Sequence, residues 1–220
     1  MKNFILKLLD LIYKKHCYFC KNSSENQRMC DNCYKNIKFL DLNTKKIIEN
    51  SKVYCATFYN DNIKKMVRAV KYHNEKDLIY FQAKLMHDYW KKLCINEQDF
   101  VVIPVPMHKK REKKRKYNHM NLVAKEFAEM MGYEINTNLV KRIKDTKPQY
   151  KLSLKEREEN LKQAFELSNN YETFKNKKIL ILDDILTTGS TLQEMINTFH
   201  KKGIYDITCF TTSCSEYYNI

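Results

Sequence analysis

Apolar residues recur along this chain in two alternating patterns, which are short continuous runs and helical spacings. Buried strands are predicted from the runs at 53–58, 100–105, 178–182 and 206–212. Amphipathic helices are predicted from apolar positions three and four residues apart, at about 63–70, 77–93, 118–131 and 191–202. Strands that alternate with helices predict an α/β fold, with a mostly parallel sheet covered by helices on both faces.

The most informative connection follows the apolar run at 178–182, where a turn is expected from Asp183 to Ser190. It contains Asp183, Asp184, Thr187, Thr188, Gly189, Ser190 and Thr191. Backbone N–H groups at a helix N-terminus attract phosphate, hydroxyls add donors, and ionised carboxylates accept hydrogen bonds from vicinal ribose hydroxyls. These residues therefore suit a ribose-phosphate ligand. Asp, Thr and Ser are also ordinary capping and turn residues, so a purely structural role remains open at this point.

Four cysteines near the start form two Cys-x-x-Cys pairs, Cys17 with Cys20 and Cys30 with Cys33. Such pairs can place four thiolates tetrahedrally around one Zn²⁺, and a shell of four thiolates leaves no open position, so the metal would be structural. Four unrelated buried cysteines are the alternative. The remaining four cysteines, Cys55, Cys94, Cys209 and Cys214, are expected to be small core residues.

Charge adds a second candidate site. The chain has 40 Lys and Arg against 26 Asp and Glu, a net charge of +14, which favours acidic partners unless it is solvated surface produced by a lysine-rich composition. The basic residues are densest in one segment that follows the run at 100–105, namely Lys109, Lys110, Arg111, Lys113, Lys114, Arg115 and Lys116. We expect a loop at the same sheet edge as the 183–190 turn. It could clamp pyrophosphate or follow a nucleic-acid backbone, with Tyr117 and Tyr72 as stacking surfaces.

The N-terminal apolar stretch at 4–12 is too short to span a bilayer and is interrupted by charge, so a helix docked on the protein's own core is expected. No transmembrane segment and no secretory signal are predicted, which makes the reducing cytoplasm the expected compartment.

The segment from Asp183 to Thr191 resembles the phosphoribosyl-pyrophosphate (PRPP) signature of type I phosphoribosyltransferases. The resemblance implies that Asp183 and Asp184 hold the ribose 2′- and 3′-hydroxyls. It also implies that residues 187–191 hold the 5′-phosphate, and that Mg²⁺ accompanies PRPP. The fold it implies is a type I phosphoribosyltransferase-like parallel sheet flanked by helices.

Further marks lie in order along the chain and together resemble the ComF/ComFC competence family. They are the paired cysteines, Val102–Pro106, Arg115–His119, Gln149, Arg157–Asn160 and Ala164–Phe165. The family has Arg-Gly-Phe-Asn-Gln where this chain has Arg-Lys-Tyr-Asn-His, so the backbone conformation at Lys116 is in question. The division implied is a helix and small zinc-ribbon-like module at 1–48 and a phosphoribosyltransferase-like domain at 49–220.

Two functions follow from these resemblances. One is a ComF-type competence protein that binds PRPP or a related ribose phosphate. Such a protein assists the handling of incoming single-stranded DNA during natural transformation, with a protein partner from the competence machinery. The other is a metabolic phosphoribosyltransferase that transfers ribose 5-phosphate from PRPP to a nucleobase. The zinc module and the basic segment favour the first function, and no residue is assigned a catalytic role.

Overall fold

The computed structural model describes residues 15–23, 26–73, 75–95, 99–146 and 154–215, with the side chains of 154, 155, 157 and 158 excepted. The expected N-terminal helix and Gln149 lie outside these residues, as does the side chain of Arg157. None of the helices in the described ranges is long and apolar enough to cross a membrane.

A six-stranded sheet forms the centre of the molecule, in the order β1-β2-β8-β7-β3-β4. Its strands are β1 (Lys46–Ile48), β2 (Ser51–Phe58), β3 (Phe100–Pro104), β4 (Glu134–Ile135), β7 (Lys178–Leu186) and β8 (Ile207–Cys214). Only β1 runs antiparallel to its neighbour, and the remaining pairs are parallel. The predicted parallel α/β architecture is confirmed.

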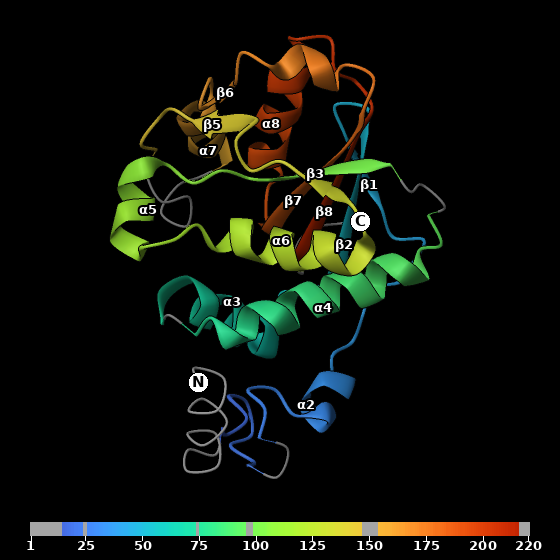
Figure 1. Cartoon of the computed structure of the whole chain (residues 1–220), viewed down its shortest axis with the longest axis vertical. Helices are drawn as coiled ribbons and strands as arrows, with labels where there is room; N and C mark the ends of the chain where they lie inside the picture. Colours follow the sequence, from blue (N-terminus) through green and yellow to red (C-terminus); the bar gives the residue numbers. More distant parts are fainter. Residues whose placement is uncertain (1–14, 24–25, 74, 96–98, 147–153, 216–220) are drawn as a thin grey trace, which may run out of the picture.

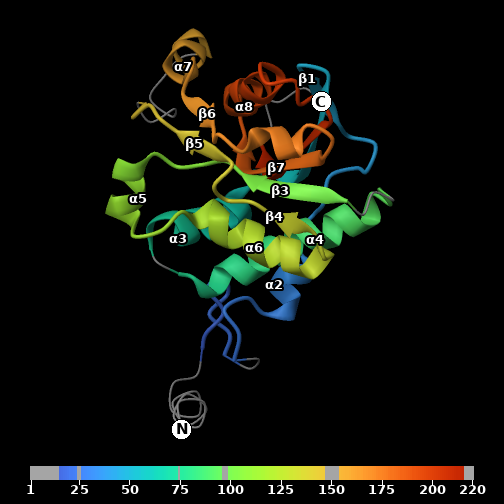
Figure 2. The same cartoon turned by 45° about the horizontal axis from the view of Figure 1, so that its top comes forward.

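Helices cover both faces of this sheet, as the helical spacings predicted (Figures 1 and 2). The helices on one face are α3 (Asp61–Tyr72), α4 (Asp77–Lys92) and α6 (His119–Met131), and α8 (Ser190–His200) lies on the other. The predicted apolar side chains of α3 are all buried, namely Ile63, Met66, Val67 and Val70. Aromatic rings fill the centre of the core, where Phe210 of β8 lies 4.9 Å from Trp90 of α4 between ring centroids.

A smaller two-stranded sheet joins β5 (Val140–Arg142) to β6 (Phe165–Leu167), next to α7 (Leu154–Leu161) and a short 3₁₀ helix at Tyr171–Phe174. These strands are too short to produce a recognisable apolar run, and no such sheet was expected. The cysteine-rich part contains α2 (Asp31–Lys35). Strand β1 falls within the expected 1–48 module but pairs with β2 in the main sheet; the boundary at residue 48 stays a prediction.

Three expectations were wrong in local structure. The basic segment is a helix, α5 (Lys109–Arg115), and not a loop, because Lys, Arg and Glu favour helix and the His108 ring accepts from the N–H of Lys110. Strand β7 continues to Leu186, so Asp183 and Asp184 lie in the strand and not in a turn. Cys94 is exposed at the end of α4, whereas Cys55, Cys209 and Cys214 are buried as expected.

Candidate functional site

The connection between β7 and α8 forms a tight turn at the carboxyl edge of the sheet. Gly189 stands at the N-cap of α8 with φ +86°, a left-handed conformation that a side chain would strain. The hydroxyl oxygens of Thr188 and Ser190 lie 2.8 Å apart, and the N–H of Ser190 donates to Thr188 Oγ1 at 3.3 Å. The first N–H groups of an eleven-residue helix therefore begin directly beside several hydroxyls, which is an arrangement that attracts an anion.

A small pocket opens at this turn. Its lining residues are Asp183, Ile185, Leu186, Thr187, Gly189, Ser190, Thr191 and Leu192. Five of the seven residues that the sequence singled out therefore share one pocket, while Thr188 and Asp184 do not line it. The pocket combines a carboxylate, several hydroxyls and a helix N-terminus within a few residues of chain.

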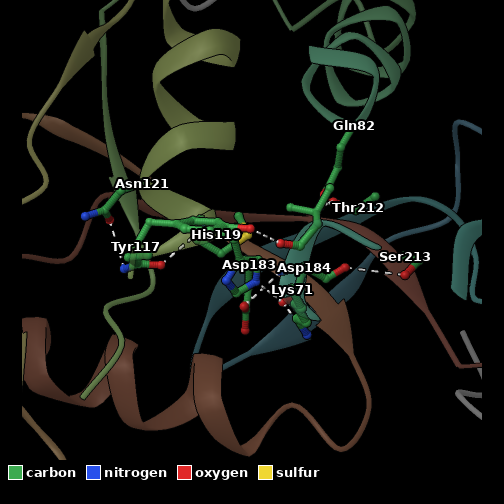
Figure 3. Close-up of polar contacts among 12 residues, drawn as sticks. Lys71, Gln82, Tyr117, His119, Asn121, Asp183, Asp184, Thr212 and Ser213 are labelled. Atoms are coloured by element: carbon green, nitrogen blue, oxygen red, sulfur yellow. Dashed lines mark hydrogen bonds and ion pairs between the residues drawn. The ribbon is translucent and has the colours of Figure 1, made fainter. Parts of the chain in front are cut away.

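Asp184 has partners of its own (Figure 3). Its Oδ2 lies 2.5 Å from Lys71 Nζ of α3 and 2.7 Å from His119 Nε2 of α6, and all three side chains are at least four-fifths buried. Neighbouring residues of a strand point to opposite faces of the sheet, so Asp184 meets α3 and α6 while Asp183 lines the pocket. The two acids are adjacent in sequence but occupy different surroundings.

These surroundings separate the pKa values of the two carboxyls. Burial and the neighbouring Asp184 charge raise the pKa of Asp183 to about 7. Burial alone would also raise the pKa of Asp184, but the Lys71 ammonium and the His119 hydrogen bond lower it well below its usual range. Asp184 is thus ionised at neutral pH, whereas Asp183 titrates near neutrality.

The sequence did not anticipate the roles of Lys71 and His119. The Lys71 ammonium faces Asp184, and the Lys71 side chain is only 17% exposed. His119 was noted only as part of the Arg115–His119 motif. Its burial lowers the pKa of the imidazole despite the hydrogen bond to Asp184. Periodicity cannot show such pairs, because the partners lie 113 and 65 residues apart in the chain.

The backbone at Lys116 turns in a left-handed conformation. Lys116 has φ +67°, the left-handed conformation that glycine adopts most easily, and it stands where the ComF pattern has glycine. Tyr117 then donates to the carbonyl oxygen of Val70 at 2.5 Å, and Asn118 caps α6. The chain therefore makes a left-handed turn at this position with a lysine.

The basic helix α5 lies at the same edge of the sheet as the turn, as expected, because it follows β3, which runs parallel to β7 (Figure 2). Lys109, Lys110, Lys113, Lys114 and Lys116 are exposed. Arg115 lies over the ring of Tyr72, 4.7 Å from its centroid, and Tyr72 is 60% exposed. This pair presents an aromatic face and positive charge to solvent together.

The four cysteines at the other end of the molecule form a candidate metal centre. The Sγ atoms of Cys17, Cys20, Cys30 and Cys33 all lie within 4.8 Å of one another. Tetrahedral zinc with sulfur at about 2.3 Å requires Sγ atoms about 3.8 Å apart, and those of Cys20 and Cys30 lie 3.6 Å apart. The N–H of Cys30 also points to Cys17 Sγ at 3.5 Å. The cluster could hold a metal ion such as zinc.

Polar contacts attach this cysteine-rich part to the face formed by α3 and α4. Arg28 forms an ion pair with Glu75 at 2.6 Å, and the Tyr34 hydroxyl donates to Asp88 at 2.8 Å. The Lys65 ammonium donates to the carbonyl oxygen of Phe19 at 3.3 Å. The cysteine cluster is therefore joined to the helices on the Lys71 side of the sheet.

The fold and the turn together define the class of the larger domain. Residues 122–213 match the phosphoribosyl transferase domain family, and this stretch contains β7, the turn and α8. The chain thus carries a phosphoribosyltransferase domain, with a four-cysteine cluster at its N-terminal side.

Curated relatives confirm the resemblance to the ComF group. The chain is 37% identical to "Competence protein F" of Haemophilus influenzae over 106 residues, 48% of this chain and 46% of the relative. It is 27% identical to "Competence protein ComFC" of Bacillus subtilis over 157 residues, 70% and 59% of the two chains. It is 28% identical to "DNA utilization protein YhgH" of Escherichia coli over 102 residues, 46% and 44%. The chain spans about half the length of these relatives.

Proposed function

We propose that this protein binds PRPP, or a related ribose phosphate, in the pocket at the end of β7. We further propose that it acts in the cytoplasm, where it assists the handling of incoming single-stranded DNA during natural transformation. The observation that carries the ligand assignment is the meeting of Asp183 with the Thr187–Thr191 turn around one pocket. The names of the relatives, which refer to competence and DNA utilization, support the cellular role.

In this proposal the turn holds the 5′-phosphate. The N–H groups at the start of α8 point along the helix axis toward the turn, and the hydroxyls of Thr187, Ser190 and Thr191 add donors to the same pocket. Gly189 leaves the backbone open to close approach by a phosphate oxygen. All of these groups come from residues that are neighbours in the sequence, so a single turn supplies most of the phosphate's hydrogen bonds.

Asp183 accepts hydrogen bonds from the ribose hydroxyls, which strengthen as its carboxyl ionises. Asp184 has a positioning role and does not contact the ligand. Its ion pair with Lys71 and its hydrogen bond with His119 fix the end of β7 relative to α3 and α6. Mg²⁺ prefers oxygen ligands and neutralises the charge of a pyrophosphate, and the Asp183 carboxylate fits such an ion. The cysteine cluster holds zinc as a structural metal.

The DNA-handling part of the proposal uses α5 and its surroundings. Exposed lysines there can follow a phosphate backbone, and the Tyr72 ring beside Arg115 offers a surface on which a base can stack. A metabolic phosphoribosyltransferase would use the same pocket, since the domain match is common to both functions. The names of the relatives favour the first.

Calorimetric titration with PRPP and Mg²⁺ tests the pocket. Asp183→Asn should weaken binding at least tenfold, and Asp183→Asn combined with Asp184→Asn should abolish it while the zinc content stays unchanged. The single variant is the cleaner test, because Asp184→Asn also leaves the buried Lys71 ammonium without its carboxylate. Asp206→Asn, an exposed acid before β8, is the matched control. Undiminished PRPP affinity in the double variant would overturn the assignment.

A further inference from the structure

Helix α3 is in contact with both candidate sites of the molecule. In its last turn, Lys71 forms the 2.5 Å ion pair with Asp184 at the end of β7. On its outer side lies the cysteine module (residues 15–35), which Figure 1 shows across α3 and α4 from the sheet. A helix of twelve residues therefore stands between the four cysteines and the strand that carries the two acids.

Two contacts on the outer side come from residues between metal-binding cysteines. Tyr18 and Phe19 lie inside the first Cys-x-x-Cys pair. The Tyr18 hydroxyl lies 3.1 Å from Nδ1 of His73, the residue directly after α3. The carbonyl oxygen of Phe19 accepts from Lys65 Nζ of α3 at 3.3 Å. Because two ligands of one metal ion fix the course of the chain between them, a bound metal would also fix both of these contacts.

A third contact reaches the same end of α3. Arg28 forms the 2.6 Å ion pair with Glu75, three residues beyond the helix. The backbone ties Arg28 to the first cysteine pair, because the N–H of Tyr18 donates to the carbonyl oxygen of Arg28 at 2.8 Å. The N–H of Glu75 in turn donates to the carbonyl oxygen of Ala69 in the last turn of α3, at 3.4 Å. Arg28 is therefore connected to the backbone of that turn through Glu75.

The earlier turns of α3 depend less on the module than the last turn does. They are anchored in the core by Ile63, Met66 and Val67, none of which is more than 1% exposed. The last carbonyl groups of a helix lack intrahelical partners, and chain ends and loops open locally before the body of a domain does. Loss of the module would thus loosen the turn that carries Lys71 and leave the rest of the helix in place.

We propose that metal binding to the four cysteines and ribose-phosphate binding at the end of β7 strengthen each other through the last turn of α3. A metal ion orders the module, the module holds the residues that follow α3, and the held turn keeps Lys71 on Asp184. Without that ion pair, the buried Asp184 carboxylate loses a cation, and the strand end that presents Asp183 to the pocket loses an anchor. The inference rests on the proposed function, since it makes the ribose-phosphate pocket of that proposal responsive to the metal.

Calorimetric titration with ribose 5-phosphate measures the effect of the metal on the pocket. Zinc-loaded protein is compared, without Mg²⁺, with the same protein after a chelator has removed the zinc and has been dialysed away. The metal-free protein should bind about fivefold to tenfold more weakly, within the usual range of coupling between two sites. In the reverse experiment, saturating ribose 5-phosphate should raise the zinc affinity by the same factor, measured by competition with a chromophoric chelator. Equal affinity for ribose 5-phosphate with and without zinc would overturn the inference.

Zinc-loaded variants test the same link should the metal-free protein unfold as a whole. Tyr18→Phe combined with Arg28→Gln cuts two of the contacts with the end of α3 and leaves the four thiolates in place. It should keep its zinc but bind ribose 5-phosphate about threefold more weakly than the wild type. Tyr34→Phe combined with Lys35→Gln is the matched control. It removes a hydroxyl and an exposed charge from the same module, but that hydroxyl contacts Asp88 of α4. Equal weakening in both variants would overturn the role of α3.

Hydrogen exchange follows the link without any ligand. In the metal-free protein the amides of His73 and Glu75 should exchange faster, while those of Met66 and Val67 keep their protection. Equal protection of His73 and Glu75 in both metal states would also overturn the inference. If zinc-loaded wild type fails to bind ribose 5-phosphate, the proposed function is overturned and the linkage with it. Binding that does not respond to the metal or to the Tyr18 and Arg28 substitutions overturns the linkage alone.

Discussion

The cysteine module (residues 15–35) and the α/β domain are held together by different forces. In the described part of the module, the buried apolar residues are only Cys17, Met29 and Cys30. The domain instead buries whole strands and large aromatic rings, among them Trp90 and Phe210. Apolar burial stabilises by about 25 cal/mol per Å² of surface removed from water, so the domain can fold on its core while the module cannot.

The two parts also differ in whether they can tolerate buried charged side chains. The domain can keep the charged Lys71 and Asp184 buried with the His119 ring at one end of the sheet, because a large core offsets the cost of burial. The module has no such reserve. Only partly buried side chains such as Tyr18, Phe19 and Tyr34 pack against the domain core, and polar contacts such as the Arg28–Glu75 ion pair accompany them. Its order should therefore depend on the metal centre.

The largest expected effect is the loss of that metal. Structural zinc contributes an apparent free energy of about 10–16 kcal/mol in small zinc domains. Cys17→Ser with Cys20→Ser should release about one zinc per chain and leave residues 15–35 open to rapid hydrogen exchange, while amides of the main sheet keep their protection. Zinc content and residue-resolved exchange measure this, with Cys94→Ser as the control. Purified wild-type protein without zinc would contradict the expectation.

A smaller effect concerns pH and has opposite signs in the two parts. Zinc binding to thiolates weakens as the pH falls. Asp183, in contrast, has a pKa raised to about 7 in the folded state from about 4 when unfolded, so the folded state binds its proton more tightly. Its contribution to stability is complete below pH 4 and is lost as the pH rises through 7.

Denaturant unfolding of wild type and Asp183→Asn between pH 5 and 8 measures this contribution. The free energy of unfolding of the wild type should fall by about 2 kcal/mol relative to the variant over this range, a value reduced from the full shift because Asp183 is partly exposed. The lowered pKa of His119 works in the opposite direction below 6.5, and comparison with the variant cancels it to first order. Parallel curves for the two proteins would show that Asp183 is not perturbed.

The smallest effect is on the proposed DNA surface. Tyr72→Ala should reduce the free energy of single-stranded DNA binding by about 1 kcal/mol. Neutralising Lys113, Lys114, Arg115 and Lys116 should reduce the slope of log affinity against log salt by up to about 3. Four exposed lysines at the opposite edge of the sheet provide a charge-matched control, namely Lys175, Lys177, Lys201 and Lys202. If both sets of substitutions gave the same slope of log affinity against log salt, the basic residues of α5 would be solvated surface and not a DNA-binding site.

The sequence predicted the main helices and the buried strands because their apolar spacing records which face meets the core. It also predicted the cysteine cluster, whose members lie close in sequence and need no long-range information. It could not predict that β7 continues past Leu182, since that depends on pairing with the far end of β8, where Ile185 lies opposite Ser213. The convergence of Lys71 and His119 on Asp184 depends likewise on tertiary packing.

Thermal unfolding of the purified protein with and without PRPP and Mg²⁺ tests the central claim most directly. Ligand at one hundred times its dissociation constant should add about 2.7 kcal/mol of stability, a rise in Tm of roughly 5–10 °C that Mg²⁺ alone does not produce. Such a rise, absent in Asp183→Asn, is the predicted result. An unchanged Tm at millimolar PRPP would contradict the assignment of the pocket at the end of β7.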